Sequence, residues 1–148
     1  MSVINEGFFE LIRQKVFEYH SVPMSGVVGP DYEKAQNRSV LIFTLEIILE
    51  EHRKNHASLV SPLSGKQALH HLLLTKFGWT LSEIRGLSLQ DSIFAITDNK
   101  FCLENLPENA QYIIKQYNAH RAKTFFPSLE DDEWDPELFL QMPKQRNW

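Results

Sequence analysis

The sequence predicts a mainly α-helical protein, with six or so helices in a single orthogonal bundle and at most one short strand. Apolar residues recur at steps of three and four along several stretches, which is the spacing of one helix face. Residues that favour helix N-termini stand just before these stretches, and they are Asn5, Asp31, Ser64, Thr80, Ser88 and Asn105. Most glycines and prolines fall between the stretches, and 148 residues suffice for one domain.

Two helices are expected in the first part of the chain, at residues 6–20 and 31–56. The apolar positions of the first are Phe8, Phe9, Ile12, Val16 and Tyr19. The segment SVPMSGVVGP, residues 21–30, contains two prolines and two glycines and is expected to be a loop. Residues 40–49 are rich in β-branched side chains, which strands also favour, so strand and helix both stay open there. The helical steps between Phe43, Ile47 and Glu51 favour the helix.

Three capping patterns predict the starts of further helices: Ser64 with Gln67, Thr80 with Glu83, and Ser88 with Asp91. The helix that begins near Ser64 is expected to end at Phe77, with Gly78 as the left-handed residue after it. Short helices are expected at 81–87 and 89–97. The alternating segment KFCLE, residues 100–104, predicts a strand, and Asn105 with Pro107 predicts a helix that runs to about Lys123.

Charge divides the chain into two parts. Residues 1–127 contain 13 acidic and 13 basic side chains, whereas residues 128–148 contain six acidic and two basic ones and carry the whole net charge of −4. The domains predicted are therefore a helical body, 1–127, and an acidic tail, 128–148. Proteins that bind nucleic acid unaided usually present a basic stripe, and no such stripe is visible in the sequence.

The sequence offers little for catalysis or for metal binding. His52 and His56 lie one helical turn apart, but a third ligand is missing from the pattern. Cys102 is the single cysteine and has no activating residue nearby in the sequence. We therefore expect no enzyme activity, no metal and no cofactor. The absence of a signal-peptide pattern and of a long apolar run predicts a cytoplasmic protein with no membrane span.

The tail combines acidic residues with apolar anchors. WDPELFLQM predicts a short helix with Asp135 as its cap and Pro136 in its first turn. The anchors are Trp134, Leu138, Phe139 and Trp148. This helix fits the groove of a partner protein, or it folds back on its own core or that of a dimer partner. The second alternative is favoured, because permanent exposure would leave a large apolar patch.

Two family resemblances bear on function. FGWTLSEIRGL, residues 77–87, resembles the segment that follows the DNA-binding part of MerR-type regulators, whose winged helix-turn-helix sequence is absent upstream. Leu72 to His120 resembles the FlhD-type subunit of the bacterial flagellar master transcription activator. The shared order is an apolar helix that ends near a glycine, a capped short helix, Leu87-Ser88-Leu89, a polar helix before Asn99, a strand such as KFCLE and a final helix. This resemblance implies a mostly helical dimer that regulates transcription, with a partner subunit that supplies much of the DNA contact.

The corner at residues 76–100 is where DNA or partner contact is expected. The contact residues predicted there are Lys76, Trp79, Arg85, Gln90 and Lys100. Direct reading of DNA by the second helix is disfavoured, because Ser88 alone separates the helices and Asp91 repels phosphate. The function predicted is a transcription regulator that acts as a dimer, with a second subunit, on DNA. The alternative is a non-enzymatic interaction or immunity-like inhibitor module whose acidic tail binds a basic partner.

Overall fold

The computed structural model describes residues 2–25 and 29–142, and in that part of the chain the fold is α-helical with no strand. The α-helices are α1 (Glu6–Tyr19), α2 (Pro30–His56), α3 (Lys66–Phe77), α4 (Leu81–Arg85), α5 (Leu89–Ile96) and α6 (Glu108–Gln116). Short 3-10 turns lie between α5 and α6 and after α6. The first two are η1 (Asn99–Phe101) and η2 (Leu103–Asn105), and the others are η3 (Ala119–Arg121), η4 (Asp131–Glu133) and η5 (Leu138–Gln141). The mainly α prediction is confirmed. Within the described ranges, no helix is both long and apolar enough to cross a bilayer.

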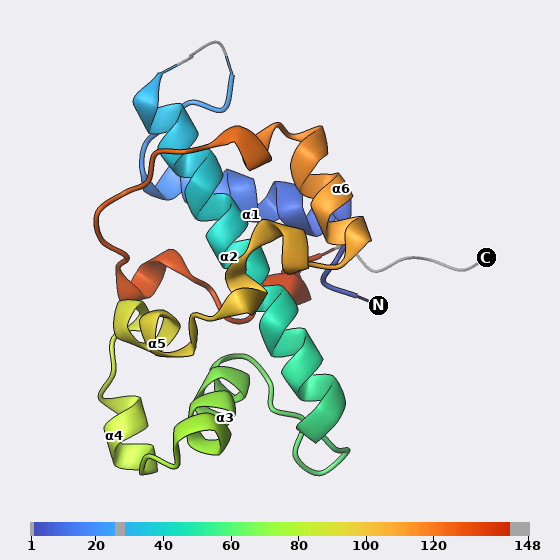
Figure 1. Ribbon diagram of the computed structural model, residues 1–148, viewed down its shortest axis with the longest axis vertical. Coiled ribbons are helices and arrows are strands. Elements are labelled where there is room, and N and C mark those ends of the chain that lie inside the picture. Colours follow the sequence, from blue (N-terminus) through green and yellow to red (C-terminus); the bar gives the residue numbers. More distant parts are fainter. Residues whose placement is uncertain (1, 26–28, 143–148) are drawn as a thin grey trace, which may run out of the picture.

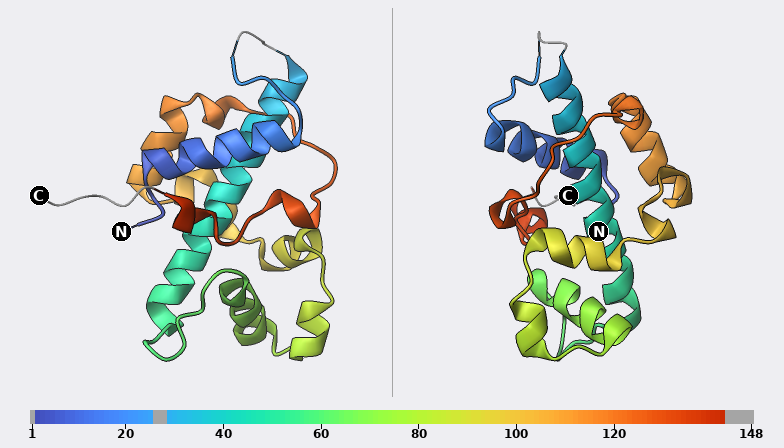
Figure 2. Two further views of the ribbon diagram at one scale, coloured as in Figure 1. Left: turned by 180° about the vertical axis from the view of Figure 1, so that it is seen from behind. Right: turned by 60° about the vertical axis from the view of Figure 1, so that its left-hand side comes forward.

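The long helix α2 runs through the middle of the molecule, and the other helices lie around it (Figure 1). Helices α1 and α6 lie on opposite sides of it, α3 and α4 lie near its C-terminal end, and α5 lies above them beside the middle of α2 (Figures 1 and 2). The chain after α6 returns along α2 and passes over α5 before it crosses back toward α1 (Figures 1 and 2).

The core is densest where α1 crosses α2. Phe8, Phe9 and Phe17 of α1 are almost fully buried. The ring of Phe9 lies 4.9 Å from that of Phe43 on α2 and 5.2 Å from that of Tyr117, just after α6. Burial of such aromatic side chains removes a large apolar area from water, so this contact is a main source of stability.

Helix α2 is buried around most of its circumference between Ile42 and Leu49, where every residue is buried. Its neighbours lie on several sides, so its apolar positions do not form one narrow stripe. This explains why residues 40–49 resemble a strand in sequence. The structure resolves the alternative in favour of the helix.

Several predicted caps are confirmed. The Asn5 side chain accepts a hydrogen bond from Phe8 N at 3.0 Å, and the Ser88 hydroxyl accepts one from Asp91 N at 3.0 Å. The predicted Ser64 cap is wrong, because α3 begins after Gly65, and Gln67 N donates to the Ser64 backbone carbonyl instead. Gly65 has a φ of 56°, a positive value that glycine adopts without strain. The predicted Asp31 cap is also wrong, since Gly29 precedes the first turn of α2.

The predicted strand at KFCLE is wrong. Two 3-10 turns, η1 and η2, occupy this segment, and the Asp98 side chain caps the first by accepting from Lys100 N at 2.8 Å. No neighbouring strand is present in the described chain to pair with it, so the backbone is satisfied locally instead. Helix α6 is shorter than predicted, because Asn118 adopts a left-handed φ of 58° after it. Its cap position is held by Pro107 rather than by Asn105.

The predicted helix of the tail is reduced to a four-residue 3-10 turn, η5. Asp135 still acts near its start, where its side chain accepts from Glu137 N at 3.0 Å. The turn lies across α1 and α2 rather than projecting into solvent (Figure 2).

Candidate functional site

The corner between α3 and α4 is formed by local signals. Gly78 ends α3 with a φ of 69°, the left-handed conformation expected there. The Thr80 hydroxyl then accepts from Glu83 N at 3.2 Å, and the Glu83 carboxylate accepts from Thr80 N at 3.4 Å. This capping box satisfies amide groups at the start of α4 and turns the chain sharply.

Three apolar side chains remain at the surface of this corner, and we call them the corner patch: Phe77, Trp79 and Leu81. Phe77 and Leu81 are 37% and 44% exposed, and Trp79 is half-buried. The rings of Phe77 and Trp79 stack, with centroids 4.4 Å apart and an angle of 14° between their planes. Stacking holds the two aromatic side chains in a fixed orientation before any partner arrives.

Charges of both signs surround the corner patch. Lys76 Nζ lies 3.1 Å from Asp98 Oδ2 and 5.9 Å from the centre of the Phe77 ring. Glu83 and Arg85 are exposed on α4. An apolar centre with mixed charges at its edge is typical of protein interfaces, whereas a nucleic-acid surface is mostly basic.

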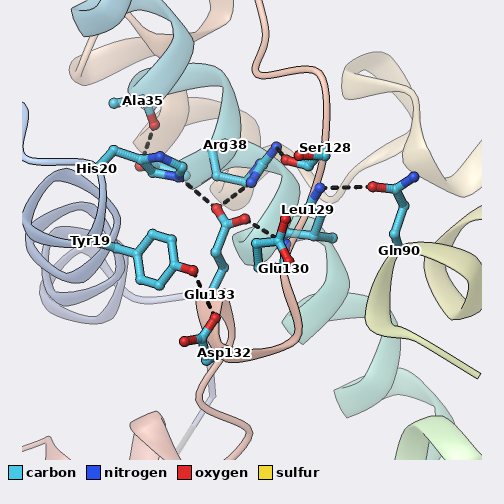
Figure 3. Close-up of polar contacts among 11 residues, drawn as sticks. Tyr19, His20, Ala35, Arg38, Gln90, Ser128, Leu129, Glu130, Asp132 and Glu133 are labelled. Atoms are coloured by element: carbon cyan, nitrogen blue, oxygen red, sulfur yellow. Dashed lines mark hydrogen bonds and ion pairs between the residues drawn. The ribbon is translucent and has the colours of Figure 1, made fainter.

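The five predicted contact residues differ in what they already contact. Lys76 and Trp79 both contact Phe77 at the corner, and Arg85 and Lys100 are exposed on α4 and η1. Gln90 has another role, because its Oε1 accepts a hydrogen bond from Leu129 N at 2.8 Å (Figure 3). That contact ties α5 to the tail.

The tail anchors pack on their own chain. Trp134 and Leu138 are only 5% and 4% exposed, and the ring of Phe139 meets that of Phe8 edge-on at 5.0 Å. Trp148 lies outside the described residues. Trp134 and Leu138 are therefore not available to a partner while the tail keeps this position.

A buried ionic cluster fixes the tail to the body (Figure 3). The Glu133 side chain is 2% exposed, and its Oε1 lies 2.6 Å from His20 Nε2 and also pairs with Arg38. Arg38 donates a second hydrogen bond to the Ser128 carbonyl at 2.8 Å. The ring of Phe126 stacks on His20 at 3.9 Å. A buried carboxylate is tolerated here because it has a cation and further donors around it.

Two more tail carboxylates accept hydrogen bonds from the body. Asp132 Oδ1 accepts from the Tyr19 hydroxyl at 2.7 Å, and Asp131 Oδ1 accepts from Leu89 N at 2.7 Å. The hydrogen bond to Asp132 is the main reason that the pKa of Tyr19 is raised to about 12. The acidic residues therefore position the tail against α1 and α5.

Two of the cavities lie beside residues 132–140 of the tail. One, of about 280 Å³, lies between α1 and residues 132–138 and includes Lys15, Glu18 and Tyr19 in its lining. The described lining contains no serine, cysteine or histidine that would act as a nucleophile. The other, of about 270 Å³, includes Glu46 and Glu50.

Glu46 is a buried acid that contacts the tail. Burial raises its pKa to about 7, and its Oε1 accepts a hydrogen bond from Trp134 Nε1 at 3.1 Å. Sequence reasoning missed both Glu46 and Arg38. For Glu46 the available signal was its place within the apolar run of α2, because a charged residue there needs a buried partner. Arg38 stands before that run, between Asn37 and Ser39, and offered no such signal.

No protein-family model, curated protein or solved structure matches this chain.

Proposed function

We propose that this chain is a subunit of a transcription regulator, that it works as a homodimer joined through the corner patch, and that a second regulator protein supplies most of the DNA contact. The observation that carries this proposal is the partly exposed Phe77–Trp79 stack beside Leu81. Exposed aromatic side chains that are already held in place are favourable anchors for protein association.

The charges around the corner patch support a second copy as the occupant. A two-fold axis brings the same surface of two molecules together, so the surface must complement itself. Lys76 and Arg85 provide cations there, and Glu83 and Asp98 provide anions. Such a mixed edge can pair with its own copy without leaving an excess of either charge.

The predicted DNA-contact residues already make contacts within the chain, and this supports a second subunit that binds the DNA. Lys76 is paired with Asp98, and Gln90 is occupied by the tail. Helix α5 exposes Asp91 and Phe94 to solvent, neither of which favours phosphate. The resemblance of residues 72–120 to FlhD-type subunits supports the regulatory role, although the segment that corresponds to a strand forms two 3-10 turns here.

A gel-shift titration at low salt tests this function. Random-sequence DNA is titrated with the chain alone and with the chain plus regulator proteins encoded beside it. We expect weak or no retardation with the chain alone and clear retardation with the correct second subunit. Absence of DNA association in both arms contradicts the proposal.

A second candidate function is favoured by the exposed acidic residues of the tail. Glu130, Asp131, Asp132, Asp135 and Glu137 are all exposed on a segment that the body holds in place. A fixed row of carboxylates suits a basic protein partner, as in an inhibitor or immunity-like module. In that case neutralising Glu130 and Glu137, which unlike Asp131 and Asp132 are not used to hold the tail on α1 and α5, weakens binding of the basic partner and leaves the dimer intact.

A further inference from the structure

Three histidines from two helices meet at the C-terminal end of α2. His52 and His56 lie one turn apart on α2, and His71 of α3 lies beside them. His52 is buried, His71 is half-buried and His56 is exposed. His71 is the third residue that the sequence spacing of His52 and His56 lacked.

The spacing of the three rings is that of ligands around one ion. Their centroids are 4.4 Å apart for His52 and His56, 5.0 Å for His52 and His71, and 5.4 Å for His56 and His71. A tetrahedral zinc ion binds imidazole nitrogen at about 2.0–2.1 Å, which places neighbouring ring centroids about 5 Å apart. All three observed distances lie close to that value.

The donor atoms of two rings already face each other. His52 Nε2 lies 2.8 Å from His71 Nδ1, so a proton bridges the two nitrogens. With the rings as they stand in the described chain, no group of three donors closes around an ion. A half-turn of an imidazole about its Cβ–Cγ bond exchanges nitrogen and carbon positions but leaves its centroid in place. The inference therefore rests on the spacing of the ring centroids. Metal binding requires the rings to turn and the shared proton to leave.

Metal binds the neutral form of imidazole. Two cationic side chains, Arg53 and Lys100, lie near His52 and oppose a metal ion there. The negative end of the α2 helix dipole, where His56 is the last residue, attracts a cation and offsets part of the repulsion from Lys100 and Arg53.

We propose that His52, His56 and His71 form a binding site for a divalent transition-metal ion of the zinc class, which fastens the end of α2 to α3. Three histidines leave a fourth coordination position, and the exposure of His56 gives water or an anion access to it. This site is separate from the corner patch, so it does not depend on the proposed function.

Calorimetric titration with Zn²⁺ tests the site on chelator-treated full-length protein that carries no polyhistidine tag. We expect one ion per chain with a dissociation constant in the micromolar range or below. Co²⁺ should give the intense visible absorption of a tetrahedral complex. The variants His56→Gln and His71→Gln should each weaken Zn²⁺ binding at least about tenfold.

His70→Gln is the matched control, because His70 is the neighbour of His71 on α3 and is not part of the three ring pairs. It should bind Zn²⁺ as the wild type does. His56 is exposed, so its variant should fold, and circular dichroism checks this. Absence of Zn²⁺ binding at millimolar concentration, or equal binding by the His56 and His71 variants and the wild type, overturns the proposal.

Discussion

Glu133 is among the most buried charged side chains of the tail, and it contacts two groups of the body. Its carboxylate pairs with Arg38 of α2 and with His20, just after α1. Its second oxygen accepts from Glu130 N at 2.7 Å, which holds the η4 turn. One side chain therefore connects the tail to two helices and also shapes the tail.

Replacing Glu133 by glutamine should lower the free energy of unfolding by about 3 kcal/mol, because Arg38 is then left as a buried charge without a counter-ion. Urea denaturation of the wild type and the variant measures this difference. Glu51→Gln, an exposed position on α2, is the control and should change stability by less than about 0.5 kcal/mol. A Glu133 variant as stable as the control would show that the ion pair contributes little.

Glu46 makes stability depend on pH. Its pKa is about 7 in the folded chain and 4.5 in the unfolded chain, so between these values the folded state binds more protons. The protonated Glu46 side chain therefore stabilises the folded state fully below pH 4.5. The free energy of unfolding falls as the pH rises through 7 and Glu46 ionises. The loss at pH 8 is about 3 kcal/mol.

Glu46→Gln should therefore be more stable than the wild type at pH 8 and about equally stable at pH 5. The amide oxygen can still accept the hydrogen bond from Trp134, but the side chain cannot ionise. Unfolding is measured from pH 5 to pH 8 for both proteins. Every other titrating group is present in both proteins, so the difference between the two curves reports on Glu46, and parallel curves would contradict its raised pKa.

At the scale of elements, the tail is part of the core. Trp134 and Leu138 are buried, and Phe139 packs against α1. The acidic residues that suggest a free, solvated segment in the sequence are in part acceptors for α1 and α5.

Trp134→Ala should cost about 4 kcal/mol of stability, because it leaves a large cavity and removes the hydrogen bond to Glu46. Leu140→Ala is the matched control in the same segment, since Leu140 is 77% exposed and its truncation should be nearly neutral. Thermal unfolding compares the two variants. Equal melting temperatures would indicate that the tail detaches in solution.

Local signals predicted the helices well, and contacts between distant residues were not predicted. Asn5, Thr80 and Ser88 bond to residues only three positions away, so sequence spacing suffices to predict these caps. The KFCLE alternation failed because a strand needs a distant partner. Likewise, the approach of His71 to His52 depends on the loop that returns α3 to α2, which no local pattern specifies.

At the scale of the whole molecule, polar residues on α2 bind segments that return to it from elsewhere. Arg38 and Glu46 contact the tail, and His52 contacts α3. Each would be costly if left unpaired in the core, so these contacts select one arrangement of the surrounding segments. The corner patch lies outside this network and remains exposed, which suits it to association.

Light scattering coupled to size exclusion tests the corner patch as the contact between two copies most directly. The wild type should have twice the mass of one chain. Leu81→Glu should have the mass of a single chain, because it places a charge in the apolar contact while a carboxylate in the first turn still suits α4. Leu59→Glu, at an exposed position outside the corner, should remain dimeric. A monomeric wild type, or a Leu81→Glu variant with the same dimer mass as the wild type, would contradict the account.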